Sequence, residues 1–166
     1  MTIKRSFPPV TDARTRLLIL GSLPGDRSLA EARYYAHPQN QFWPLISAVI
    51  GADLTRLDYD QRLAALRDTR VGLWDVVASA RRNGSMDAAI IDPIANDLAA
   101  LVRTLPDLRA IGFNGATAHR HGLKQLGALA ADIALVALPS SSALHTIGLA
   151  AKLPAWTALR EYLRQG

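Results

Sequence analysis

The chain contains no cysteine among its 166 residues. Disulfide frameworks, thiolate metal sites and iron–sulfur clusters all need cysteine, so these three classes are excluded. Because nothing in the chain depends on an oxidising compartment, we expect it to work in the reducing cytoplasm.

Long hydrophobic runs are also missing. No apolar stretch reaches the roughly eighteen residues that suggest a membrane-spanning helix. The first sixteen residues, MTIKRSFPPVTDARTR, lack the apolar centre and small-residue cleavage site of a signal peptide, so we expect none. The sequence also lacks HExxH or similar metal-binding spacing, a GxSxG nucleophile elbow, and the Walker and GxGxxG phosphate loops. Metallohydrolases, acyl-transfer hydrolases and dinucleotide enzymes therefore have little support.

Acidic residues are outnumbered by basic ones, 14 against 19, which gives a net charge of +5. Most of the basic residues are arginine, whose guanidinium group binds phosphate oxygens in a fork. This balance favours a polyanionic partner such as a nucleic acid, although a soluble enzyme from an arginine-rich proteome would show it too. The length and the 49% hydrophobic content predict one domain over residues 1–166, with residues 1–15 as an irregular lead-in.

Short apolar runs alternate with helical patterns along the chain. Strands are expected at residues 16–21, 71–77, 109–113 and 133–138. Helices are expected at residues 42–50, 60–70, 92–105, 115–125 and 149–163, with Asp92 and Pro93 as a helix start and Pro154 near the start of the last helix. This order predicts an α/β fold, a three-layer α/β/α domain around a mainly parallel four-stranded sheet.

Three of the expected strands end in turn-forming or polar residues. These ends are Gly-Ser-Leu-Pro-Gly at 21–25, Asn114, and Pro-Ser-Ser-Ser at 139–142. In a parallel sheet such ends lie at one edge, where α/β folds bind ligands. The long loop at 21–41 can reach the same edge, and its aromatic, amide and imidazole side chains suit a flat, hydrogen-bonding ligand such as a nucleobase.

Each candidate residue has a functional and a structural interpretation. Phe42 could stack on a base or be the first core residue of its helix. Asn40 could position a water or cap that helix. Asn114 could match the C=O/N–H edge of uracil or hypoxanthine, or cap the helix that follows it. The turn at 21–25 could present backbone N–H groups to a ligand or merely reverse the chain.

The last polar loop allows the same two interpretations. Ser140, Ser141 and Ser142 could hold phosphates with hydroxyls and helix N–H groups, or cap a helix. His145 lies close enough to take part. Arg81 and Arg82, beside a turn, are candidates for phosphate contacts, whereas His119 and His121 fall on different faces of a helix and are expected at the surface.

The order and spacing of these elements resemble the uracil-DNA glycosylase superfamily. In that family a GxxPG-type loop follows the first strand, an NxFW-type element comes next, a later strand ends in a base-reading asparagine, and a PS-rich loop precedes the last helix. Here they are GSLPG at 21–25, NQFW at 40–43, Asn114, and PSSS at 139–142. The string AHPQNQFW is similar to the mismatch-specific uracil/thymine branch. YYAHPQNQFW and GLWDVV look most like the hypoxanthine-DNA glycosylase branch, and the resemblance covers residues 17–156.

The resemblance implies a repair reaction on double- or single-stranded DNA that contains a deaminated base: hypoxanthine, uracil or xanthine. The damaged nucleotide is flipped out, Phe42 stacks on the base and Asn114 reads its edge. Leu23 and Pro24 help to hold the base or the water, and Ser140, Ser141 and Ser142 grip phosphates. Water then breaks the N-glycosidic bond and leaves an abasic site, with no metal or cofactor and with a monomer as the working unit.

One position departs from the family pattern. Vigorous uracil glycosylases carry Asp or Asn in the first motif to orient the water, and this chain has Ser22. By resemblance to the hypoxanthine branch, Asn40 then becomes the preferred water-positioning residue, with Ser22, His145 and His37 as secondary candidates. Two alternatives stay open: a non-catalytic nucleic-acid-binding module, and a hydrolase of free nucleosides that uses the same pocket.

Overall fold

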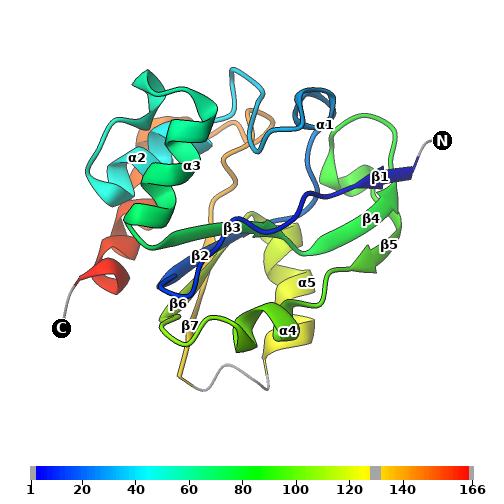
Figure 1. Ribbon diagram of the computed structural model, residues 1–166. Helices are drawn as coiled ribbons and strands as arrows, with labels where there is room; N and C mark the ends of the chain where they lie inside the picture. The colour runs from blue at the N-terminus through cyan, green and yellow to red at the C-terminus, as the bar shows by residue number, and fades with distance from the viewer. Residues whose placement is uncertain (1–2, 128–131, 165–166) are drawn as a thin grey trace.

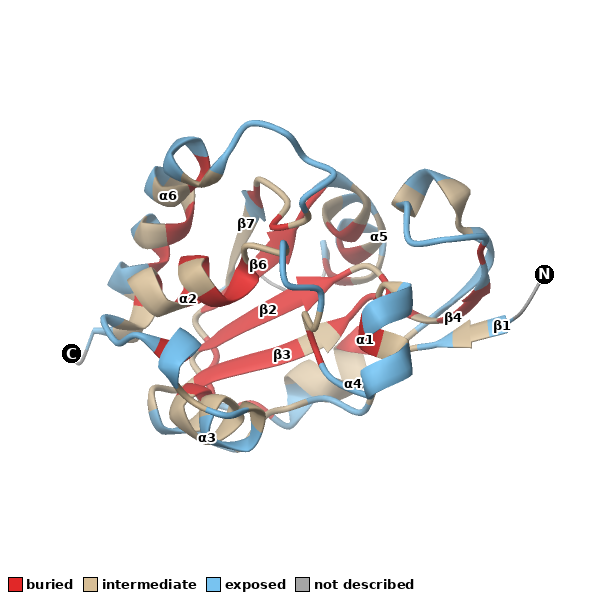
Figure 2. Cartoon of the chain, turned by 90° about the horizontal axis from the view of Figure 1, so that it is seen from above, coloured by how far each residue is buried: buried red, intermediate tan, exposed pale blue. Residues whose placement is uncertain are grey.

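A four-stranded parallel sheet forms the centre of the computed structural model, which describes residues 3–127 and 132–164. Its strand order is β3-β2-β6-β7, and every neighbouring pair is parallel. The strands are β2 (Leu17–Gly21), β3 (Val71–Asp75), β6 (Ala110–Asn114) and β7 (Ala134–Leu138). The predicted parallel sheet is therefore confirmed, and Figure 2 shows its central strands as the buried part of the molecule.

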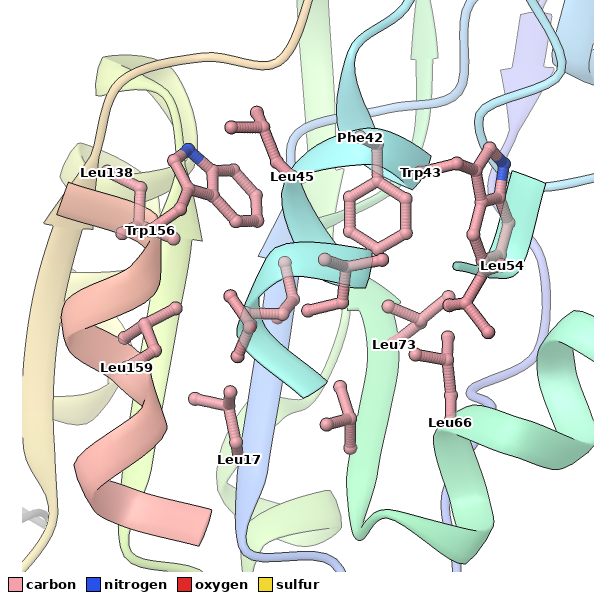
Figure 3. Packing of buried hydrophobic residues seen from close by; sticks show 14 of the residues in the cluster. Leu17, Phe42, Trp43, Leu45, Leu54, Leu66, Leu73, Leu138, Trp156 and Leu159 are labelled. Carbon is pink, nitrogen blue, oxygen red and sulfur yellow. The ribbon is translucent and has the colours of Figure 1, made fainter. Parts of the chain in front are cut away.

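Helices cover both faces of this sheet (Figure 1). Strand β2 shows why, because Leu17 and Ile19 point into one core cluster while Leu18 and Leu20 point into another. The first cluster is packed by α2 (Phe42–Ile50), α3 (Tyr59–Asp68), α6 (Leu149–Thr157) and two 3-10 helices, η1 (Leu54–Arg56) and η3 (Ala158–Leu163) (Figure 3). The second is packed by α4 (Leu98–Arg103) and α5 (Ala116–Leu126). The three-layer prediction is confirmed.

Local sequence explains where several helices begin and end. Helix α2 has the bounds that its apolar stripe predicts, and it stops at Gly51, which has φ of 73°. Helix α3 starts with a capping box in which Asp58 and Gln61 exchange side-chain and backbone hydrogen bonds. The long loop contains a short helix, α1 (Asp26–Glu31). No helix within the two described ranges is long and apolar enough to cross a membrane.

A second, antiparallel sheet was not predicted. Its order is β1-β4-β5, formed by β1 (Ile3–Arg5), β4 (Val77–Arg81) and β5 (Ile91–Ala95), so part of the expected lead-in is a strand. The 3-10 helix η2 (Asp87–Ala89) lies in the β4–β5 connection.

The predicted helix at 92–105 is wrong at its start. Asp92 has φ of 51° and belongs to β5, an edge strand on which Pro93 is tolerated because an edge has unpaired N–H positions. The helix begins at Leu98, where the Asp97 side chain accepts a hydrogen bond from Ala100 N. The expected helix at 149–163 divides into α6 and η3, and Pro154 lies inside α6 rather than near its start.

The carboxyl ends of the parallel strands lie side by side. Gly21 pairs in register with Asp75, and Asn114 pairs with Leu138. The loops that follow β2, β3, β6 and β7 therefore leave the sheet at one edge, as the sequence predicts.

Candidate active site

A cavity of about 480 Å³ opens at this edge of the sheet. Its volume lies within the range of small-ligand sites. It brings together nearly all the residues that the sequence singled out, and these are Ser22, Leu23, Pro24, His37, Asn40, Asn114, Ser140, Ser141, Ser142 and His145. Phe42, Arg81 and Arg82 do not line it.

Ser141 joins the two asparagines of the site. Its backbone N–H donates to Asn114 Oδ1 at 2.8 Å, and Asn114 Nδ2 donates back to Ser141 Oγ at 2.9 Å. The same hydroxyl donates to Asn40 Oδ1 at 2.8 Å. Since Ser141 and Asn114 are 1% and 7% exposed, three distant chain segments are held together by buried and half-buried hydrogen bonds. Asn114 does not cap α5, whose N-cap position is Gly115.

Asn40 hydrogen-bonds to the first residue of α2 and also lines the cavity. Its Oδ1 accepts a second hydrogen bond, from Phe42 N at 2.9 Å, so both lone pairs of this oxygen are engaged. Among the described residues, none accepts a hydrogen bond from its Nδ2. The amide N–H₂ group is therefore the part of Asn40 that is available to a ligand.

The aromatic wall of the cavity is Tyr35 rather than Phe42. Phe42 is 0% exposed and lies in the core beside Trp43 (Figure 3). Tyr35 stacks on it, with ring centroids 3.9 Å apart, and it is Tyr35 that lines the cavity. The expectation that Phe42 itself faces a base does not fit this geometry, because the Tyr35 ring covers it. The sequence places Tyr35 in the long loop. Only the folded path of that loop shows that the Tyr35 ring, and not the Phe42 ring, faces the cavity.

The Gly-Ser-Leu-Pro-Gly loop is held in place by a buried arginine. Arg82 is 1% exposed, and its guanidinium donates to Leu23 O at 3.4 Å and Pro24 O at 2.6 Å. The suggested phosphate contact of Arg82 is therefore wrong, since burial removes it from DNA. Arg81, its neighbour, is paired with Asp92.

Ser22 is paired with a carboxylate that sequence reasoning did not select. Its Oγ donates to Asp87 Oδ1 at 2.6 Å. Asp87 belongs to η2, in the β4–β5 connection, and it also lines the cavity. The contact orients the Ser22 hydroxyl proton toward Asp87 and leaves the oxygen lone pairs free to face the cavity.

Asp75 is a second carboxyl in the wall, at the end of β3. It is 4% exposed, and its Oδ2 has no hydrogen-bond partner among the described residues. The pKa of Asp75 is raised to about 7: burial is the main cause, the negative charge of Asp87 adds to it, and Arg82 opposes both. The tyrosine at its side stays neutral, because burial and Asp75 both raise the pKa of Tyr35.

The serine loop holds its shape through short-range hydrogen bonds. Ser140 Oγ accepts from Ser142 N and Ser142 Oγ from Leu144 N, both at 3.1 Å. Helix α6 starts only at Leu149, so these serines do not cap it. Ser141 is buried, which leaves the half-buried Ser140 and Ser142 as the candidates for phosphate contacts.

Three further side chains complete the rim and its support. His145 is exposed on the rim, and His37 accepts a hydrogen bond from Gln39 N through its Nδ1 at 3.1 Å. Lys152, which the sequence did not indicate, donates from its Nζ to Ser142 O at 3.3 Å. Burial lowers the pKa of Lys152.

Comparisons with known proteins point to one superfamily. A model of the uracil DNA glycosylase superfamily matches residues 8–163. A hypoxanthine DNA glycosylase of Methanosarcina barkeri is 46% identical over 112 residues, which cover 68% of this chain and 71% of the relative. A hypoxanthine DNA glycosylase of Methanosarcina acetivorans is 46% identical over 113 residues, 68% of this chain and 72% of the relative.

A solved structure extends the likeness over the whole fold. It is the solution NMR structure of a candidate uracil DNA glycosylase from Methanosarcina acetivorans, 37% identical, with a TM-score of 0.84. The match covers 98% of this chain and 100% of that one. The chain belongs to the uracil DNA glycosylase superfamily.

Proposed function

We propose that the protein is a DNA glycosylase that removes hypoxanthine from DNA by hydrolysis of the N-glycosidic bond and leaves an abasic site. The observation that carries this proposal is the set of Asn40, Ser141 and Asn114, which hydrogen-bond to one another inside the cavity. The two relatives named as hypoxanthine DNA glycosylases support the choice of base.

Base recognition depends on Asn114 and Tyr35. A flipped hypoxanthine presents O6 as an acceptor next to N1–H as a donor, and the Asn114 amide carries the complementary pair. Binding the base replaces the long contact of 3.3 Å between Asn114 Nδ2 and Tyr35 OH. The Tyr35 ring, which is backed by Phe42, offers a face on which the base stacks.

The hydrolytic step depends on Asn40 and Ser22. The free Nδ2 of Asn40 donates a hydrogen bond to the attacking water and places it at C1′ of the sugar. The Ser22 hydroxyl, oriented by Asp87, offers a second polar contact on the first loop. Donors already fixed in a half-enclosed cavity stabilise charge that develops on the departing base without having to reorganise.

DNA is held at the rim of the cavity. Ser140 and Ser142 contact the phosphates that flank the flipped nucleotide. Leu144 is 61% exposed at the rim, a costly position for an apolar side chain in a free protein. We assign it the role of a wedge that fills the space left in the base stack. One copy supplies every residue of this site, so the chain works as a monomer and as a single domain.

The test is base release from defined DNA. Duplexes and single strands with one hypoxanthine, uracil or xanthine are incubated with the protein, and abasic sites are then cleaved with alkali. We expect strand scission at hypoxanthine, and the uracil and xanthine arms measure how far the activity extends. DNA binding without scission would instead support a non-catalytic module. Turnover of free deoxyinosine but not of DNA would support a nucleoside hydrolase.

A further inference from the structure

Asp75 has a geometry that fold stability does not explain. Its carboxyl group lies over the backbone of Gly21, where a Cβ would come within 2.6 Å of Asp75 Oδ1 and 3.1 Å of Tyr35 OH. Residue 21 must therefore be glycine for this carboxyl to occupy its place in the cavity. A buried carboxyl oxygen without a partner is costly, and structures rarely keep one without a use for it.

The charged neighbours of Asp75 do not neutralise it by direct pairing. Arg82 lies close enough to influence its pKa but directs its hydrogen bonds to the carbonyls of Leu23, Pro24 and Gly84. Asp87 opposes ionisation from η2, and the phenols of Tyr34 and Tyr35 lie near enough for the charge of Asp75 to raise their pKa values. Near neutral pH a large fraction of the Asp75 side chains therefore carries a proton, which an ordinary aspartate would have lost.

We infer that Asp75 is a catalytic acid of the glycosylase reaction, a carboxylic acid in the cavity wall that protonates the departing purine. This inference rests on the proposed function, because it needs a flipped purine in the cavity. The Asp75 side chain lies beside Tyr35, on which the base stacks, and Tyr35 in turn contacts Asn114. Asp75 lines the cavity, and its Oδ1 lies over Gly21 near the Tyr35 hydroxyl, so the carboxyl group is on the side of the cavity that we assign to the base.

The proton and the electrons balance over the cycle. As the bond between C1′ and N9 breaks, its electron pair goes to the purine, and the Asp75 proton goes to a basic ring nitrogen such as N7. Neutral hypoxanthine leaves, and water adds to C1′. The proton that this water loses passes through solvent to the Asp75 carboxylate and restores the acid. Uracil has no comparable basic ring nitrogen, so this step favours purines.

The experiment is a pH profile of single-turnover hypoxanthine release from duplex DNA by the wild type, Asp75→Asn and Asp87→Asn. For the wild type we expect the rate to fall above a pH of about 7, the pKa of Asp75, as the acid form is lost. Asp75→Asn should lose ~100-fold at pH 6, within the range for removal of a general acid, and its rate should not vary with pH. Its binding to the same duplex should stay within a few fold of the wild type.

Asp87→Asn tests the assignment with Asp75 left in place. Removal of the neighbouring negative charge lowers the pKa of Asp75, so the alkaline fall should begin at lower pH. This variant decides the question even if Asp75→Asn does not fold. A wild-type rate that does not fall at alkaline pH, a fall that survives in Asp75→Asn, or a fall that Asp87→Asn does not shift would overturn the inference and leave the proposed function standing. A wild type that releases no deaminated base would overturn both.

Discussion

Tyr35 lies face to face on Phe42, with ring centroids 3.9 Å apart and ring planes inclined by 17°. One ring thus belongs to the cavity and the other to the core beneath it. This pair separates two roles that the sequence assigned to Phe42 alone, and variants of the two residues should behave differently.

Replacement of Tyr35 by alanine should slow hypoxanthine release roughly 5- to 150-fold, because a base stacked on an aromatic ring gains about 1–3 kcal/mol. Tyr35→Phe keeps the ring and loses only the long contact with Asn114, so it should stay within a few fold of the wild type. Phe42→Leu is the matched control, and its main effect should be a lower Tm. Single-turnover rates and thermal melts measure these effects. A Tyr35→Ala variant with the wild-type rate would remove Tyr35 from base binding.

Asn40 allows a test of which end of its amide acts in the reaction. In Asn40→Asp one oxygen can still accept from Phe42 N and Ser141 Oγ, whereas the donating N–H₂ group becomes a second acceptor. If donation positions the water, both Asn40→Asp and Asn40→Ala should lose base release by ~100-fold or more, the order of magnitude of a lost positioned donor. Binding to hypoxanthine DNA, measured by fluorescence anisotropy, should persist in both. An Asn40→Asp variant as fast as the wild type would show that the reaction needs an acceptor there.

Adjacent serines should separate catalysis from DNA binding. Ser141→Ala removes the hydroxyl that accepts from Asn114 Nδ2 and donates to Asn40 Oδ1, which costs about 1–3 kcal/mol and loosens both side chains. We expect slower base release with DNA affinity nearly unchanged. Ser142→Ala, one position further along a half-buried part of the loop, should instead weaken DNA binding at moderate salt. Equal effects of both variants on the rate would argue that Ser141 only shapes the loop.

Leu144 should affect the rate of base release only in duplex DNA, where a flipped nucleotide leaves a space in the base stack. Leu144→Ala shortens the exposed side chain at the rim and should slow release from duplex DNA while sparing release from a single strand of the same sequence. Ile147→Ala is a suitable control, because Ile147 is 52% exposed in the same segment but does not line the cavity. If Leu144→Ala slowed both substrates equally, the residue would be a general contact and not a wedge.

The parallel sheet could be predicted because its strands are short, mostly apolar runs, and three of them, β2, β3 and β6, are largely buried, as Leu17–Gly21 shows. Strand β5 could not, because all its residues are exposed and it has no apolar face to create a pattern. Asp92 and Pro93 in that strand then imitate a helix start.

The residues of the site also fall into those that the sequence could predict and those that it could not. Asn114 and Ser141 could be predicted because Asn114 is the last residue of β6 and Ser141 lies in the loop that follows β7. Asp87 and Arg82 could not, because they reach the cavity and the first loop from the second sheet, through contacts distant in the sequence. Asp75 did leave a signal, a single carboxylate within the apolar GLWDVV segment, but its place beside Gly21 depends on strand register.

The buried carboxyl of Asp75 should also make stability depend on pH. Its pKa is about 7 in the folded protein against an ordinary value of 3.8, so between these values the folded state binds more protons than the unfolded state. The free energy of unfolding therefore falls as pH rises through this window and is constant above it. The total fall is at most about 1.4 kcal/mol for each unit of difference between the two pKa values. The Asp75→Asn variant has no ionisable group at this position, so it should not show this fall in the free energy of unfolding. Its stability relative to the wild type, measured by urea denaturation, should increase from pH 4.5 to pH 8, and the surface variant Asp68→Asn should show no such trend. A difference between Asp75→Asn and the wild type that is the same at both pH values would mean that the carboxyl ionises as easily in the folded protein as in the unfolded chain.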